Sequence, residues 1–179
     1  PRSGVAQIEY VEDPNGIVFV RMVDGLLHTF TYKRDEEVVA WSQRTMAGTS
    51  AAVESMASIP SVDGKSNTLY FIIKRTINSA TTRYIEFFEE RFEPTSLTDK
   101  DDAFLVDSGA TYDGTSTTTI TGLGHLEGET VQVLADGAVR PNAVVASSQI
   151  TLATAAQVVH VGLQISAIAT TLPVEVPTP

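Results

Sequence analysis

Two short runs of alternating apolar and polar residues, joined by an Asp-Gly pair, constrain the fold most strongly. The runs cover residues 17–23 and 26–32, and Asp24-Gly25 lies between them. Alternation with a period of two is typical of a strand with one buried face. A type I′ turn needs positive φ angles at both central residues, which an Asp-Gly pair tolerates. The pattern therefore predicts a β-hairpin closed by a two-residue type I′ turn.

Further runs of the same kind lie on both sides of this hairpin. They predict strands at residues 8–11, 38–42, 53–59, 68–74 and 81–88, with Asn78-Ser79 as a turn. Only residues 86–92, where acidic residues and Phe alternate irregularly, also fit a helical turn. We therefore expect residues 1–92 to form an antiparallel β meander.

The composition changes after this meander. Residues 93–114 contain the acidic run Asp99-Lys100-Asp101-Asp102 and the turn pairs Ser108-Gly109 and Asp113-Gly114, so we interpret them as a linker. Beyond them the sequence predicts short strands at residues 117–121, 130–135, 144–145, 149–152 and 158–161. Turn residues recur about every 8–12 residues, as in small sandwiches and barrels. We expect a small β-barrel or sandwich at residues 115–165, a tail or return segment at 166–179, and an all-β protein overall.

The charge balance argues against two classes of partner. The chain carries 22 acidic and 12 basic residues, which gives a formal charge of −10. A net negative charge repels phosphate backbones and anionic lipids at long range. We therefore predict no specific nucleic-acid binding and no membrane insertion, and we interpret Lys33-Arg34 and Lys74-Arg75 as solvated strand ends.

The chain contains no cysteine. This excludes disulfides, thiolate catalysis and cysteine metal sites. The sequence begins at Pro1 without an initiator Met and ends in a Pro-rich stretch. From these ends we expect a piece of a longer polypeptide.

Several phrases, taken together, resemble one family of viral structural proteins. They are Val23-Asp24-Gly25-Leu26-Leu27, Val39-Ala40-Trp41-Ser42, Val53-Glu54-Ser55-Met56-Ala57-Ser58-Ile59-Pro60, Arg83-Tyr84-Ile85-Glu86, Val106-Asp107-Ser108-Gly109-Ala110-Thr111-Tyr112-Asp113-Gly114 and Gly122-Leu123-Gly124-His125-Leu126-Glu127-Gly128. In combination they resemble the tail nozzle or tail tubular protein B-like chains of short-tailed bacteriophages. The resemblance extends from about Ile17 to Pro173.

The resemblance implies a fold, partners and a location. It implies a β-propeller-like body of four-stranded antiparallel blades, interrupted by a small inserted β-barrel that begins near Thr115. Chains of this family are several times longer, so the propeller is expected to be incomplete here. Its members are structural proteins of the virion tail that bind copies of themselves and other tail proteins. Such a chain is expected to be soluble in the host cytoplasm before assembly.

The residues that carry catalysis or bind metals in other proteins form no known motif here. His28, His125 and His160 lack the spacing of a metal site, and we interpret them as strand or turn residues. Ser108 lacks the glycine pattern of a nucleophile elbow. The glycines of residues 122–128 lack the complete phosphate-binding fingerprint. We therefore predict no catalytic, cofactor-binding or metal-binding residue.

Two other features leave alternative functions open. The acidic residues Glu86, Glu89, Glu90, Glu93, Asp99, Asp101 and Asp102 offer paired carboxylates, but they lack the pattern of a calcium loop. The aromatic residues Trp41, Tyr70, Phe71, Tyr84, Phe87 and Phe88 alternate as core residues do. Our first hypothesis is a non-enzymatic structural component of a phage tail. The alternatives are a glycan- or receptor-binding module at residues 115–163 and a polysaccharide-cleaving tail enzyme that uses Glu86 and Asp101.

Overall fold

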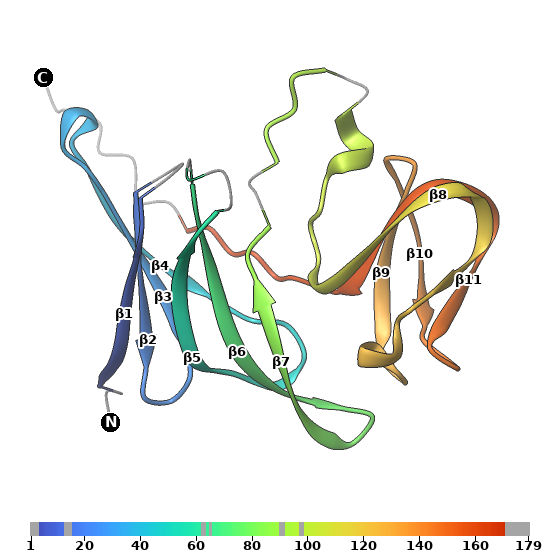
Figure 1. Cartoon of the computed structure of the whole chain (residues 1–179), viewed down its shortest axis with the longest axis horizontal. Helices are drawn as coiled ribbons and strands as arrows, with labels where there is room; N and C mark the ends of the chain where they lie inside the picture. Colours follow the sequence, from blue (N-terminus) through green and yellow to red (C-terminus); the bar gives the residue numbers. More distant parts are fainter. Residues whose placement is uncertain are drawn as a thin grey trace, which may run out of the picture.

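The computed structural model describes residues 4–12, 16–61, 64, 66–89, 92–96 and 99–170. Its strands form three sheets along the long axis of the molecule (Figure 1). The N-terminal sheet contains β1 (Val5–Val11), β2 (Ile17–Met22), β3 (Leu27–Lys33) and β4 (Val38–Arg44). The middle sheet contains β5 (Thr49–Pro60), β6 (Asn67–Ile77) and β7 (Ala80–Phe87). The C-terminal sheet contains β8 (Asp107–Thr121), β9 (Thr130–Ala135), β10 (Ala138–Val144) and β11 (Gln149–Leu163).

The predicted all-β class is confirmed. Every pair of neighbouring strands is antiparallel. In the N-terminal sheet and in the middle sheet, each strand pairs with the next one along the chain, so both are simple meanders. The only helical elements among the described residues are the 3-10 turns η1 (Arg34–Glu36), η2 (Asp99–Asp102) and η3 (Gly124–Leu126). Within the same residues no helix has the length and apolar content to cross a bilayer. No sheet closes into a barrel, since the C-terminal sheet is open with the order β10-β9-β11-β8.

The predicted hairpin forms between β2 and β3, but its turn is not type I′. Gly25 has a positive φ of 85°, whereas Asp24 does not. The Gly25 N–H donates to the Met22 carbonyl, and the Met22 N–H donates to the Leu26 carbonyl. These bonds define a three-residue connection in which Gly25 is the left-handed bulge residue. A two-residue turn with two positive φ angles occurs instead at Asn78 and Ser79, between β6 and β7, where a turn was predicted.

The N-terminal and middle sheets pack face to face. Phe19 and Leu27 of the first share a core with Phe71 and Ile73 of the second. Most contacts join β1 and β2 to β5 and β6, so the two sheets meet along β1 and β5. There the Gln7 carboxamide accepts from the Met56 N–H and donates to the Met56 carbonyl, which satisfies two backbone groups on the free edge of β5.

The C-terminal sheet bends around a core of its own. Its two longest strands, β8 and β11, are both 15 residues long, and their pairing shifts register near Thr151 and Ala156. Figure 1 shows this ribbon arching over β9 and β10. The bend brings Ile120 and Ile150 into one buried cluster with Val133. The strands predicted at residues 149–152 and 158–161 are therefore two parts of one bent strand.

The predicted linker of residues 93–114 is partly regular, because β8 begins at Asp107. The residues before β8 lie on the outer side of the C-terminal sheet. A Cβ atom on Gly109 would lie 2.4 Å from the Phe104 ring, and one on Gly162 would lie 2.7 Å from Val106. The two glycines therefore make room for this segment. The return segment is described only as far as residue 170, without regular structure, and the other residues of the predicted tail lie outside the described ranges.

The turn between β9 and β10 is tied to the bend of β11. The Asp136 carboxylate accepts hydrogen bonds from the N–H groups of Val158 at 2.9 Å and Gln157 at 3.0 Å. These two bonds, that of Val158 first, hold the pKa of the Asp136 carboxyl below its usual value. The ionised carboxylate therefore stabilises the folded chain.

This contact predicts a dependence of stability on pH. The folded pKa lies below the unfolded value of about 3.9, so the contribution is complete above that pH and is lost as the pH falls through the folded pKa. Asp136→Asn should lower the Tm at neutral pH, and its Tm should fall less steeply than that of the wild type below about pH 4. Thermal unfolding followed by circular dichroism measures this. Asp113→Asn, at an exposed site on β8, is the control. Parallel pH profiles for wild type and Asp136→Asn contradict the prediction.

Candidate functional site

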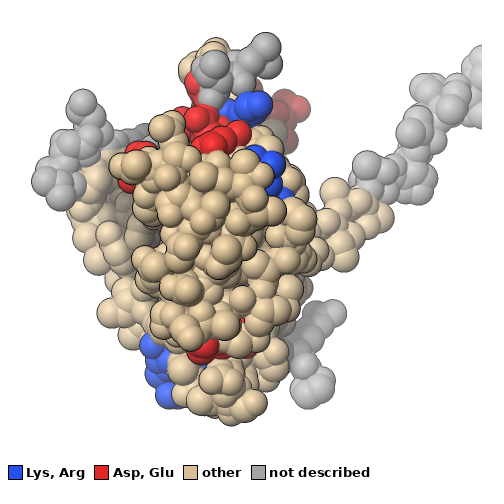
Figure 2. Space-filling view, turned by 90° about the vertical axis from the view of Figure 1, so that its right-hand side faces the viewer, with Lys and Arg blue, Asp and Glu red and all other residues tan. Residues whose placement is uncertain are grey.

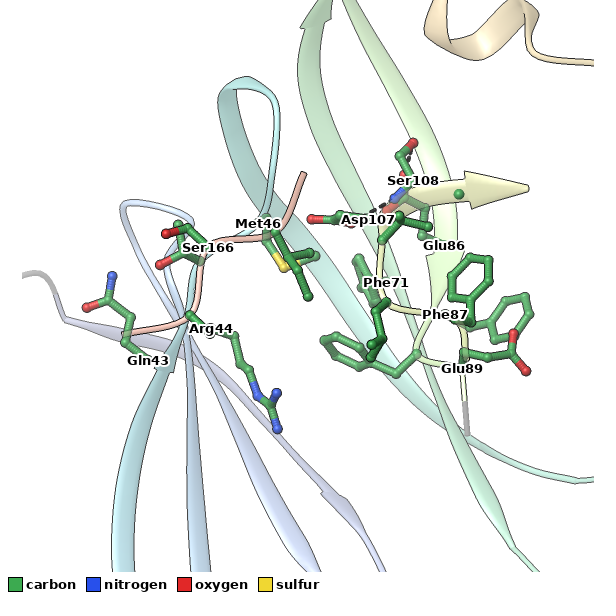
Figure 3. Close-up of a pocket in the computed structure, with 18 of the residues that line it drawn as sticks. Gln43, Arg44, Met46, Phe71, Glu86, Phe87, Glu89, Asp107, Ser108 and Ser166 are labelled. Carbon is green, nitrogen blue, oxygen red and sulfur yellow. Dashed lines mark hydrogen bonds between the residues drawn. The ribbon is translucent and has the colours of Figure 1, made fainter. Parts of the chain in front are cut away.

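A groove of about 1430 Å³ opens where the N-terminal and middle sheets diverge (Figure 3). Its walls come from the ends of β4 and β7, from the residues just before and after the start of β8, and from the return segment. Gln43, Arg44 and Met46 line one side, and Phe71 and Phe87 line the other. The groove therefore lies between the open edges of two sheets and next to the third.

A buried arginine joins the three sheets at this groove. The Arg75 side chain is 0 % exposed, and its guanidinium forms ion pairs with Glu86 of β7 and Asp107 of β8. Arg75 Nε also donates to the Ala47 carbonyl at 2.8 Å, and the Ala47 N–H donates to Asp107. One cation thus links β6 and β7, the connection between β4 and β5, and the first residue of β8. The interpretation of Lys74-Arg75 as a solvated strand end is wrong for Arg75.

The sequence contained a signal for this burial. Leu69, Phe71, Ile73 and Ile77 alternate along β6 and are all buried, and Arg75 occupies the same alternation. Alternate residues of a strand lie on one face. A charged residue on a buried face requires partners, and here both partners are carboxylates. The alternation of residues along β6 therefore predicts that Arg75 is buried, although it does not identify Glu86 and Asp107 as its partners.

Ser108 and His125 lie beside this ion pair. The Ser108 hydroxyl donates to Glu86 at 3.0 Å, and its backbone has a φ of 50°. His125 Nε2 lies 2.9 Å from the Ser108 carbonyl oxygen, which only accepts, so Nε2 carries the proton. The ring thus bonds the backbone of Ser108 and not its hydroxyl. A Ser-His nucleophile requires the base to accept the hydroxyl proton, so this arrangement is structural.

The other two histidines lie apart from the groove. His28 lies on β3, where it is the direct pairing partner of Val20 on β2. His160 is buried, with Nε2 2.7 Å from the Asp101 carbonyl and Nδ1 2.8 Å from the Thr111 hydroxyl. Its ring therefore fastens η2 to the outer side of the C-terminal sheet.

The acidic residues do not gather into one site among the described residues. Glu86 and Glu89 line the groove, but Asp101 does not. Asp99, Asp101 and Asp102 belong to η2, Glu93 precedes it, and Glu90 lies outside the described residues. Within the described chain no group of three His, Cys, Asp or Glu side chains is placed to hold a metal ion.

The outer face of the N-terminal sheet is apolar and exposed. Directly paired residues of antiparallel strands lie on one face, and Tyr10, Val18, Phe30 and Trp41 form such a row across all four strands. Phe30 and Trp41 are in contact, with ring centroids 4.7 Å apart. Trp41 is 64 % exposed. By the same pairing, Ile8, Tyr32 and Val39 extend this outer face.

The outer face of the middle sheet has the same character. Its rows are Ala57-Tyr70-Phe87 and Ser55-Ile72-Ile85. Ile85 is 76 % exposed, and Phe87 is also exposed. The two packed sheets therefore present an apolar face on each side of their shared core.

These faces correct the interpretation of the aromatic residues. Phe71 is buried, and Tyr84 and Phe88 pack against the same core, as predicted. Trp41 and Phe87 are exposed instead, because the edge strand β4 is exposed on both faces after Val38 and Phe87 lies on the uncovered face of β7. Alternation separates the two faces of a strand but does not say which of them is covered.

The charges lie away from the middle of the C-terminal sheet. Figure 2, viewed from that side, shows coloured residues above and below a broad uncharged area. In the sequence, residues 114–126 and 141–170 contain no Asp, Glu, Lys or Arg. The centre of this side therefore offers no cluster of cations for a phosphate backbone.

No protein-family model matches the chain, and no curated protein sequence matches it significantly.

The ion pair predicts a large effect of one substitution. Arg75→Met leaves the carboxylates of Glu86 and Asp107 close together without a cation, so it should lower the free energy of unfolding by about 3–5 kcal/mol. Urea denaturation followed by circular dichroism measures the loss. The triple variant that also carries Glu86→Gln and Asp107→Asn should recover part of it, since the uncompensated charges are gone.

Arg83→Met is the matched control, because Arg83 pairs with Glu54 on the exposed side of the same sheet. It should leave the free energy of unfolding nearly unchanged. If Arg75→Met and Arg83→Met lower the free energy of unfolding by similar amounts, burial of the ion pair does not determine the size of the loss.

Proposed function

We propose that this chain is a structural component of a bacteriophage tail, and that it works through interfaces with copies of itself. One observation carries the proposal: the two packed sheets expose an apolar face on each side. Soluble monomers rarely leave contiguous apolar patches of this kind uncovered, and such patches mark sites of association. The resemblance of the sequence phrases to tail nozzle proteins supports the choice of a virion tail as the assembly.

The charge of the chain favours contact at these faces. Copies that each carry −10 repel one another unless their contact lies where charge is absent. The row of Tyr10, Val18, Phe30 and Trp41 contains no charged residue, and neither do the two rows centred on Tyr70 and Ile72. Association there removes apolar surface from water without bringing like charges together.

The geometry lends less support to the alternatives. A polysaccharide-cleaving site needs two free carboxyl groups across a sugar-binding groove, whereas the Glu86 carboxylate is held by Arg75 and Ser108. A glycan-binding site at residues 115–163 would lack aromatic rings on which sugars stack, because that stretch contains no Phe, Tyr or Trp.

The proposal predicts self-association that Trp41 reports. Trp41 is the only tryptophan of the chain, so its emission reports on β4, where the ring is 64 % exposed and also borders the groove. As the concentration rises, sedimentation velocity should show larger species, and the emission should move to shorter wavelength as the ring leaves water. A chain that stays monomeric with unchanged emission at every concentration overturns the proposal.

Two matched substitutions locate the contact. Val39 lies on the outer face of the N-terminal sheet and is 64 % exposed, whereas Val139 lies on β10 and is 85 % exposed. Burial of one Val side chain contributes about 1.5–3 kcal/mol, so Val39→Ser should weaken association by about tenfold or more. Val139→Ser should leave it unchanged. An equal effect of both substitutions argues for contact elsewhere.

A further inference from the structure

We propose that the free edge of β4 accepts an extended peptide segment of a partner protein, which pairs with it as an added strand of the N-terminal sheet. The expected segment contains no proline and carries an acidic side chain two positions from an apolar one. This inference goes beyond the proposed function, because it requires no association between copies of the chain.

Regular pairing distinguishes β4 from most other outer strands. It pairs with β3 over seven consecutive residues without a register shift. The pairings of β1, β5, β8 and β10 each contain at least one shift. The edge of β5 is also closed by Gln7, and β10 contains Pro141. Bulges and prolines disturb strand addition, whereas a long regular edge is a template for it.

β7 is also a regular outer strand, but the C-terminal sheet is fastened beside it. The Ser108 hydroxyl donates to Glu86 at 3.0 Å, and the Tyr84 hydroxyl donates to the His125 carbonyl at 3.3 Å. Within the described chain, the hydrogen bonds of β4 all go to β3. Every residue of β4 after the first is exposed. We therefore place the added strand at β4.

The register shows which backbone groups of β4 are free. The Met22 N–H donates to the Leu26 carbonyl, so these residues form a hydrogen-bonded pair at the end of the β2–β3 ladder. Bonded pairs of an antiparallel ladder recur at every second residue. Even-numbered residues of β3 therefore bond β2, and odd-numbered ones bond β4. On β4, the N–H and C=O groups of Val39, Trp41 and Gln43 are thus directed away from β3.

This row of backbone groups matches an extended peptide. The free groups recur every second residue, about 6.4–6.8 Å apart, and this is the repeat of any extended chain. The groove that Trp41 and Gln43 border has a volume of about 1430 Å³, larger than the about 300–1,000 Å³ of most small-ligand pockets. A peptide added to a sheet edge gains affinity from main-chain bonds and specificity from alternate side chains.

Arg44 determines the charge of the expected peptide. Directly paired residues share a face, and Arg44 pairs with Leu27, which is buried in the core between the two sheets. Figure 3 shows Arg44 extending from β4 into the groove. Its guanidinium forms no ion pair with any described residue, and β4 contains no acidic residue. An acidic side chain opposite Arg44 therefore supplies the missing partner.

The neighbouring position on the same face favours an apolar side chain. Ser42 lies two residues before Arg44 and pairs with the buried Thr29. It lines the groove together with the core residues Phe71 and Phe88. A side chain beside Ser42 enters this groove, where removal of apolar surface from water is favourable. Of the acidic residues that line the groove, two belong to the buried ion pair, and Glu89 extends away from β4 (Figure 3).

A peptide titration of the full chain tests the inference. The probe is the acetylated and amidated peptide Thr-Leu-Thr-Glu-Thr-Leu-Thr, which presents Leu and Glu on one face in either strand direction. At millimolar concentration it should slow the amide hydrogen exchange of Val39, Trp41 and Gln43, measured by NMR. Ala40 and Ser42 should change little, because their N–H groups already bond β3.

An exchange of charges tests the role of Arg44. The peptide with Lys in place of Glu should bind the wild type several-fold more weakly, and Arg44→Glu should prefer the Lys peptide. Lys33→Glu makes the same change of net charge at the other end of the β3–β4 pair, so it should keep the preference of the wild type. Circular dichroism checks the fold of both variants. A peptide with Pro at the four positions that flank Glu should not bind, because it cannot pair as a strand.

Each other result overturns the inference. Unchanged exchange at the three amides of β4 shows that this edge accepts no strand. Slower exchange at Ile85 and Phe87 instead assigns the peptide to β7. If the β4 amides become protected in the chain alone as its concentration rises, a second copy occupies the edge. If Arg44→Glu still prefers the Glu peptide, Arg44 does not select the strand.

Discussion

The buried guanidinium of Arg75 is the interaction on which the rest of the structure depends. The chain has two apolar cores, one between the N-terminal and middle sheets and one inside the C-terminal sheet. Between them Arg75 bonds Glu86, Asp107 and the backbone of Ala47. Buried ion pairs add little net stability compared with apolar packing, but their bonds are directional. The junction therefore fixes how the third sheet is oriented, while the cores supply most of the stability.

The strands and turns were largely predictable from the sequence, because turn residues and the two-residue alternation depend only on neighbouring positions. The hairpin around Gly25 and the turn at Asn78-Ser79 follow from residues that tolerate positive φ. The continuity of β11 was not predictable, because its bend depends on pairing with β8, which is distant in the sequence, and on the Asp136 carboxylate that holds Val158. Likewise, only β6 contains the alternation that places Arg75 inside, and no pattern names its partners.

The exposed faces were missed for a different reason. A strand with one polar and one apolar face identifies its core side from sequence alone. Trp41 and Ile85 lie in alternating runs that predict one buried face, and the alternation does not say which side another sheet covers. The structure leaves both sides of β4 exposed after Val38, and on β7 it covers only the side that carries Tyr84. The difference between the pattern and the fold is therefore itself the observation that points to association.

Rigid orientation and apolar faces have complementary consequences for an assembly. Apolar packing tolerates small shifts, because dispersion and burial have little directional preference. The hydrogen bonds of Arg75, and those of Gln7 to the edge of β5, do have such a preference. The polar contacts inside the chain therefore fix the angles between its sheets, whereas apolar packing supplies the affinity of any contact at the exposed faces.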